Sequence, residues 1–207
     1  MSIDEADAAR EEFYDALRRE LYDEHKEEAI AEFTTGRLKS FYLQRPDVMR
    51  PAVEAIQEGN WQQSNGRHAA ALVFHVSAVE LLLKATLLKP VVHGLVHNEA
   101  LAEVVVRYTL GQTGFDRYGD LLAQLFRTLA NIELAEIRRE GQSKKLLEEC
   151  KALQTARNAV IHQGARSTAE EAELARLVAV AVFEMIVRPM LHSLGLAVVE
   201  KGAIVAV

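Results

Sequence analysis

Three residues near the end of a helical pattern, Arg157, Asn158 and His162, carry side chains that can act together on an anionic group. A histidine titrates near neutral pH and can accept or donate a proton. An arginine presents a planar, permanently charged fork that binds phosphate oxygens through two hydrogen bonds. These residue types suit acid–base chemistry beside a phosphate, provided that the fold brings them together.

The helix expected over 143–161 places Arg157 at the centre of its own apolar face. On a helical wheel, Leu146, Cys150 and Leu153 all fall within about 40° of Arg157. A buried charge without a partner costs several kcal/mol. This guanidinium therefore needs an acid, a cage of carbonyl groups or an external anion such as phosphate.

His162 stands five residues after Arg157, so on a continuous helix it points about 140° away. The two side chains converge only if the helix ends or distorts there, or if a second chain supplies one of them. Gly164 is a typical helix-ending residue, and it places His162 at a helix end beside the polar loop 163–166. A purely structural explanation stays open, in which Arg157 pairs with a buried glutamate and His162 caps a carbonyl group.

The elements that must position these residues are helical. Glycine and proline are scarce, at 11 and 4 residues, and the long stretches have helical spacing, which predicts an all-α fold. We expect an acidic helical extension over 1–45, a helical domain over 46–195, and a tail over 196–207 that forms a short hairpin or an added strand. The expected helices span 4–33, 47–59, 68–88, 98–110, 116–138, 143–161 and 167–194.

Breaker and capping residues set the expected ends of these helices. The Thr-Thr-Gly run at 34–36 is expected to end the first helix, and Pro90 the third. The last long helix is expected to begin with a capping box, made either by Ser167 and Glu170 or by Thr168 and Glu171.

The net charge of −6 is concentrated at the N-terminus, where residues 1–33 hold 12 acids and 4 bases. The remaining residues hold 18 acids and 20 bases, so the globular part is nearly neutral. This distribution argues against electrostatic coating of nucleic acid over a broad surface. The acidic helix is expected to be a solvated face, or to shield a site until a partner moves it.

Several classes of protein are not expected from this sequence. The single cysteine, Cys150, cannot form an internal disulfide and is expected to be a buried structural thiol. The acidic N-terminus lacks the features of a signal peptide and the apolar stretches carry charges, so we expect a cytoplasmic protein without a membrane span. His93 and His97 have metal-ligand spacing but no evident third ligand, and we expect neither a metal nor another cofactor.

The segment from Ala156 to Gly164 resembles the signature of the HEPN superfamily, the higher eukaryotes and prokaryotes nucleotide-binding proteins. That signature is an arginine, four to six residues and a histidine, often with a polar residue directly after the arginine. Arg157, Asn158 and His162 match these positions. The resemblance covers about residues 46–195 and includes the apolar helix upstream and the capped apolar helix downstream.

The resemblance implies a bundle of four or five helices that commonly dimerises. Many members look like metal-independent endoribonucleases of toxin–antitoxin, abortive-infection or CRISPR-linked defence systems, and others are inactive binding modules. In one branch, whose partner is a nucleotidyltransferase antitoxin, a tyrosine stands two residues after the histidine. This sequence has Gly164 there, so the resemblance does not imply that partner.

We therefore expect an endoribonuclease of a toxin or antiviral system that cleaves RNA by attack of the ribose 2′-hydroxyl on the adjacent phosphate. His162 is expected to be the general acid or base and Arg157 to stabilise the charge on the phosphoryl oxygens, while Asn158 orients the histidine or the phosphate. A homodimer is expected to bring two copies of the motif to one cleft. An antitoxin or another defence protein is expected as a further partner.

Charged residues elsewhere are expected to support this site. Glu80, on the most apolar helix, either positions Arg157 or forms a surface pair with Lys84. Five cationic residues either hold the RNA backbone or lie at solvated helix ends: Arg138, Arg139, Lys144, Lys145 and Arg166.

Two rival hypotheses belong to other functional classes. In the first, the chain is a catalytically inactive HEPN module that binds a protein or nucleotide partner. In the second, it is a plain helical interaction domain in which the motif is accidental. An open cleft that holds both Arg157 and His162 favours the nuclease, and a paired Arg157 without such a cleft favours the rivals.

Overall fold

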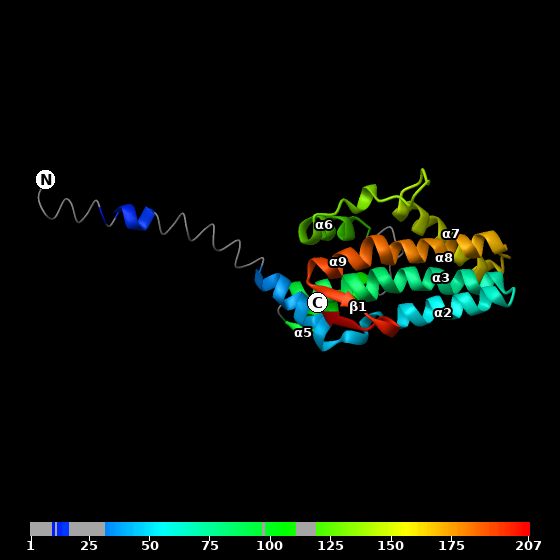
Figure 1. The fold of residues 1–207 in the computed structure, drawn as a ribbon, viewed down its shortest axis with the longest axis horizontal. Helices are drawn as coiled ribbons and strands as arrows, with labels where there is room; N and C mark the ends of the chain where they lie inside the picture. Colours follow the sequence, from blue (N-terminus) through cyan, green and yellow to red (C-terminus); the bar gives the residue numbers. More distant parts are fainter. Residues whose placement is uncertain (1–9, 11, 17–31, 97, 111–118) are drawn as a thin grey trace, which may run out of the picture.

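The computed structural model describes residues 10, 12–16, 32–96, 98–110 and 119–207. Helices dominate these residues, and a short antiparallel hairpin lies near the C-terminus (Figure 1). The prediction of an all-α fold is confirmed. Most of the first expected helix, over 4–33, lies outside the described residues.

Four long helices lie side by side and form a bundle (Figure 1): α2 (Arg50–Ser64), α3 (His68–Leu83), α7 (Leu146–Gln163) and α8 (Ala169–Val182). Helix α3 packs against the other three. Its sequence is apolar around the whole circumference, as is typical of a helix in the middle of a core. Accordingly, Leu72, Val76 and Leu82 are each only 1% exposed.

The stop predicted at 34–36 is wrong, because one helix covers residues 32–44 without a break. Its buried side chains explain why it continues. Leu38 and Tyr42 are fully buried, and the Tyr42 hydroxyl donates a 2.7 Å hydrogen bond to the carbonyl oxygen of Thr86. Tertiary packing of an apolar face stabilises a helix more than the local propensity of one glycine weakens it.

The helix end predicted at Pro90 is also wrong. Helix α3 continues through a π-helical turn, Lys84–Leu88, into α4 (Lys89–Leu95). A proline removes one helical hydrogen bond and crowds the carbonyl group four residues earlier, and the wider π turn relieves both. The same device appears before Pro189, where α8 continues through Phe183–Val187 into α9 (Arg188–Ser193).

This continuous helix, His68–Gly94, is the one stretch of the described residues with the length and apolar composition to cross a membrane. More than half of its most apolar window is buried inside the protein. Its position as the central core helix accounts for its composition.

The other predicted elements differ mainly at their ends. Helix α5 (Glu99–Leu110) matches the prediction, whereas α6 (Gly119–Ala130) ends well before the expected residue 138. Asn131 has a φ of 52°, which leaves the helical region and ends α6, and a 3-10 helix, Leu134–Glu136, follows.

The C-terminal part agrees with the sequence-based expectations. Thr168 and Glu171 form the capping box of α8, with reciprocal hydrogen bonds of 2.9 and 3.3 Å between backbone and side chain. The tail forms the expected hairpin, in which β1 (Leu196–Val198) pairs with β2 (Ile204–Ala206).

Helix α2 also runs past its predicted end at Gly59, which serves as a packing site. Gly59 is buried beneath the ring of His75, and α2 continues to Ser64. A Cβ added at Gly59 would lie 2.5 Å from Cε1 of His75. The glycine therefore allows α2 and α3 to approach each other closely.

Gly59→Ala is expected to lower the free energy of unfolding by about 1–3 kcal/mol, the usual cost of overpacking a core. Chemical denaturation measures this change. The control is Gly36→Ala, because a Cβ at that helical position meets no atom within 4 Å. That variant should gain up to about 1 kcal/mol from helix propensity. Equal effects of the two substitutions would contradict the packing argument.

Candidate functional site

Helix α7 carries the motif and has well-defined ends. At its start, the backbone N–H of Lys145 donates a 3.2 Å hydrogen bond to the Glu148 carboxylate. At its end, Gly164 adopts the left-handed conformation with a φ of 66°, which is the helix stop that the sequence predicts. The helix therefore runs unbroken through both Arg157 and His162.

Arg157 is partly buried between α7 and α3. Its side chain is 26% exposed, and its Nη1 lies 3.9 Å from Oε1 of Glu80 and donates a 3.2 Å hydrogen bond to Oδ1 of Asn158. Glu80 also accepts a 3.0 Å hydrogen bond from Gln154. The structure thus brings Glu80, Arg157 and Asn158 together, while the positioning role of Glu80 stays a prediction.

The guanidinium of Arg157 is incompletely satisfied in the single chain. Its Nε is buried and, within the described residues, makes no hydrogen bond. The contact with Glu80 is at the outer limit of an ion pair, and the Asn158 contact engages one nitrogen only. A second anion could therefore be bound without breaking a strong internal pair.

His162 lies in the last turn of α7 and is exposed. Because the helix is continuous between them, His162 and Arg157 point about 140° apart. One chain therefore does not bring the two motif residues to a common point. The distortion that would let them converge within one chain is absent from α7, which leaves a second chain as the remaining route.

Three of the five predicted RNA-binding cations, Lys144, Lys145 and Arg166, occupy two distant places. Lys145 and Lys144 precede the first turn of α7, and the helical rise puts Lys145 about 26 Å from His162 along the axis. The Nζ of Lys145 is paired with Glu136 at 2.6 Å, and Lys144 is exposed. Only Arg166, exposed in the loop after α7, lies close to His162 in the chain.

A buried ion pair near the start of α7 corrects the expectation for Arg139, which is neither at a solvated helix end nor free to hold an RNA backbone. Arg139 donates two hydrogen bonds, of 2.8 and 2.6 Å, to the carboxylate of Glu149. The two side chains are 14% and 7% exposed, so each neutralises the other inside the protein. Glu149 lies beside Cys150 on α7, and burial raises the pKa of the Cys150 thiol to about 12, which suits the expected structural role.

A second buried polar group, which was not predicted from the sequence, joins α2, α3 and α8. The ring of His75 is fully buried, and its Nε2 lies 3.3 Å from Oε1 of Gln63. Gln63 in turn donates a 2.8 Å hydrogen bond to Glu173, which is held by two hydrogen bonds from Arg176. Burial lowers the pKa of His75 to about 4, so the ring is neutral at physiological pH. A histidine in the middle of an apolar run was the available signal.

No family model, curated protein or solved structure matches this chain. The assignment of the candidate site therefore rests on the geometry of its residues and on the motif. Three pockets are defined by described residues, and neither Arg157 nor His162 lines any of these three.

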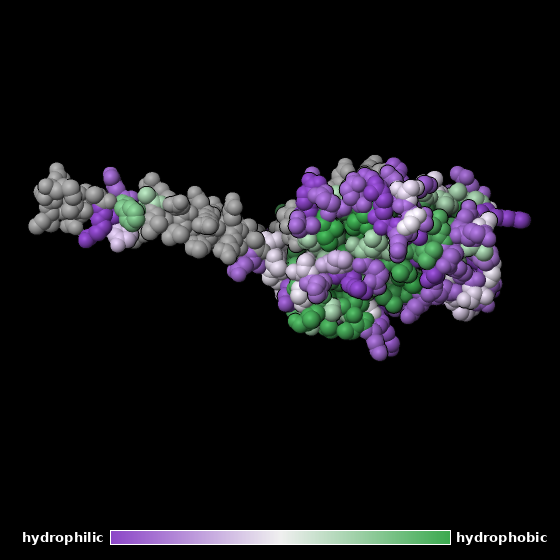
Figure 2. Space-filling view, turned by 45° about the horizontal axis from the view of Figure 1, so that its top comes forward, coloured by the Kyte–Doolittle hydropathy of each residue, from purple (hydrophilic) through white to green (hydrophobic). Residues whose placement is uncertain are grey.

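An exposed apolar stripe lies on α8, the helix that follows the motif. Leu174, Leu177 and Val180 recur at intervals of three residues and are about 40% exposed each. Ile161, next to His162 on α7, is 46% exposed. The outer surface of the bundle carries such apolar areas between polar patches, as Figure 2 shows for one face.

Proposed function

We propose that this chain is a metal-independent endoribonuclease of the HEPN type, with an active cleft that forms between two copies. The observation that carries the proposal is the state of the motif on α7. Arg157 is partly buried with an incompletely satisfied guanidinium, and His162 is exposed at the capped end of the same helix. Both groups are thus available to a phosphate and a proton.

The proposed reaction needs no metal. The ribose 2′-oxygen attacks the adjacent phosphorus and the bond from phosphorus to the 5′-oxygen breaks, which leaves a 2′,3′-cyclic phosphate and a 5′-hydroxyl. One proton leaves the attacking hydroxyl and one joins the leaving oxygen. His162 performs these transfers, and Arg157 stabilises the charge on the phosphoryl oxygens. Asn158, bonded to Arg157, holds the guanidinium in place.

A second copy of the chain supplies what one copy lacks. Two proton transfers ask for two titrating groups, and a two-fold dimer that faces the α7 helices would contribute two copies of His162 and of Arg157. The stripe of Leu174, Leu177 and Val180 offers apolar surface for such an interface. Arg166 would line the entrance for the RNA backbone, whereas Lys144 and Lys145 would contact a longer RNA further along α7.

The biological setting that the motif supports is a toxin or an abortive-infection system in the cytoplasm. Such a nuclease must be silent until it is needed, and an antitoxin or other defence protein would keep it so. The acidic segment over 1–33 is a candidate for shielding the site from RNA through like-charge repulsion.

Arg157→Lys is expected to lose most of the RNA cleavage, because lysine keeps the charge but lacks the bidentate fork. The assay follows fragments with 2′,3′-cyclic phosphate ends in the presence of EDTA. Arg166→Lys is the control. Because Arg166 is an exposed loop residue, this variant should retain most of the RNA cleavage. Full activity of Arg157→Lys would show that Arg157 is structural.

A catalytically inactive HEPN module that binds a protein partner is the second candidate. The contacts of Arg157 with Glu80 and Asn158 favour it, as does the position of Arg157 and His162 outside the three pockets described above, because a paired arginine without an open cleft is what this candidate predicts. RNA cleavage by the wild-type chain separates the two candidates, and Glu80→Gln tests whether Glu80 positions Arg157. The nuclease proposal expects a lower cleavage rate at nearly unchanged stability, whereas the inactive module shows no RNA cleavage in either protein.

A further inference from the structure

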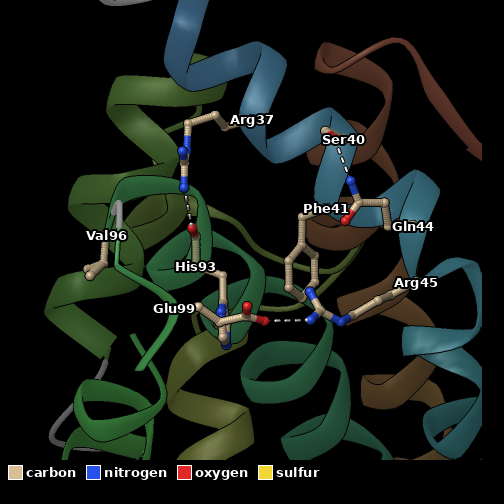
Figure 3. A pocket seen from close by; sticks show the side chains of 8 residues that line it. All are labelled: Arg37, Ser40, Phe41, Gln44, Arg45, His93, Val96 and Glu99. Atoms are coloured by element: carbon tan, nitrogen blue, oxygen red, sulfur yellow. Dashed lines mark hydrogen bonds and ion pairs between the residues drawn. The ribbon is translucent and has the colours of Figure 1, made fainter. Parts of the chain in front are cut away.

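A polar pocket of about 320 Å³ lies far from the motif, between the helix over 32–44 and the α4–α5 region (Figure 3). The residues that line it come from both sides: Arg37, Ser40, Phe41, Gln44, Arg45, His93, Val96 and Glu99. This pocket shares no residue with the proposed nuclease site, so a ligand bound there does not depend on nuclease activity.

One wall of the pocket is a single helix face. Arg37, Ser40, Phe41 and Gln44 are spaced by three or four residues, which aligns them along one side of the helix. Arg37 donates hydrogen bonds to the carbonyl oxygens of Gly94 and His93, which fix its guanidinium across the pocket (Figure 3). The Ser40 oxygen accepts a hydrogen bond from Gln44, so the Ser40 hydroxyl proton remains available.

The opposite wall contains a deeply buried histidine. The His93 side chain is 5% exposed, and its ring stacks on Phe41 with 5.3 Å between centroids. Its Nε2 is 3.3 Å from Oε1 of Glu103, but within the described residues it makes no hydrogen bond. The nitrogen thus lies beside a carboxylate that does not line the pocket, and His93 contributes a flat, buried ring to the pocket wall.

Cations outnumber anions in the lining. Arg37 and Arg45 contribute two guanidinium groups, and Arg45 lies over the outer face of Phe41 at 4.5 Å from the ring centroid. Glu99 is the single carboxylate among the lining residues described, and it pairs with Arg45 at 3.2 Å. Their side chains are 47% and 75% exposed, so this pair is worth at most about 1 kcal/mol and opens readily.

We propose that this pocket binds a small phosphorylated molecule. The phosphate would replace the Glu99 carboxylate on Arg45 and receive hydrogen bonds from Arg37 and the Ser40 hydroxyl, the donors that a phosphate prefers. The pocket is larger than a phosphate alone needs, so an organic group of modest size fits beside Val96 and His93. Such a ligand would join the helix over 32–44 to α4 and α5.

The test is isothermal titration calorimetry of the full chain with inorganic phosphate and ribose 5-phosphate, and with ribose as the uncharged control. Saturable binding of the phosphorylated sugar is expected, with no binding of ribose. Arg45→Gln should weaken binding by about tenfold or more, the loss of one charge-assisted contact. Glu99→Gln should strengthen it by about two- to fivefold, because the competing carboxylate is removed.

Arg50→Gln is the matched control, because Arg50 is an equally exposed arginine that pairs with Asp47 outside the pocket. It should leave the affinity unchanged. The opposite signs at positions 45 and 99 are not expected from a general loss of structure. Three results would overturn the proposal: no binding of either phosphate ligand up to about 10 mM, equal binding of ribose, or equal effects of Arg45→Gln and Arg50→Gln.

Discussion

His162→Ala is expected to lower the rate of RNA cleavage by about 10²- to 10⁴-fold, the usual contribution of a general acid–base group. The side chain is exposed in the last turn of α7, so its removal leaves the core intact and the thermal stability should hardly change. Cleavage is measured on total RNA in EDTA, and the products are tested for 2′,3′-cyclic phosphate ends.

The control for this variant is His192→Ala. His192 is likewise an exposed histidine in the last turn of a helix, but it lies on α9 and not beside the motif. Its loss should leave cleavage unchanged. If His162→Ala and wild type cleave at the same rate, His162 is not catalytic. If cleavage stops when EDTA is added, the metal-independent chemistry is wrong.

The features that could be predicted are those that local chemistry decides. Gly164 ends α7 because a glycine adopts a positive φ at little cost, and the Thr168–Glu171 capping box needs only residues three positions apart. The hairpin at the C-terminus was likewise one of the two forms expected for the tail over 196–207. In each case, the atoms that interact are close in the sequence.

The errors occur where long-range packing outweighs a local signal. Gly36, Gly59 and Pro90 all stand inside helices, although each was expected at or near a helix end. Gly59 lies inside a helix because the ring of His75, on the next helix, occupies the space where a Cβ would be. Pro90 is accommodated by a π-helical turn. Neither the neighbouring ring nor the altered turn can be inferred from a window of local sequence.

Parts of the candidate site could be predicted from local sequence, and other parts depend on long-range packing. The helical wheel placed Arg157 at the centre of an apolar face, whereas the structure leaves its side chain 26% exposed and 3.9 Å from the carboxylate of Glu80, on α3. The wheel gives directions around a helix and not distances along it. It therefore did not show that Lys144 and Lys145 lie at the opposite end of α7 from His162. The ion pair of Arg139 and Glu149 was not predicted, because the two side chains come into contact only when the loop before α7 folds back against that helix.

Leu177→Glu is expected to convert a homodimer into monomers and, with it, to abolish nearly all RNA cleavage. Leu177 lies in the middle of the exposed stripe on α8 and is 40% exposed in the single chain, so a glutamate is tolerated in the monomer. In a dimer, the same charge would be buried without a partner, which costs several kcal/mol. Light scattering reports the oligomeric state, and cleavage is measured in parallel.

Leu101→Glu is the matched control, because Leu101 is an exposed leucine on α5, outside the stripe and away from α7. It should change neither the oligomeric state nor the activity. Dilution adds a second readout, since the specific activity of wild type should fall as dimers dissociate. The proposal of a shared cleft rests on the angle of about 140° between Arg157 and His162 on α7. A fully active monomer, whether wild type or Leu177→Glu, would therefore remove the reason for a second chain and refute the composite site.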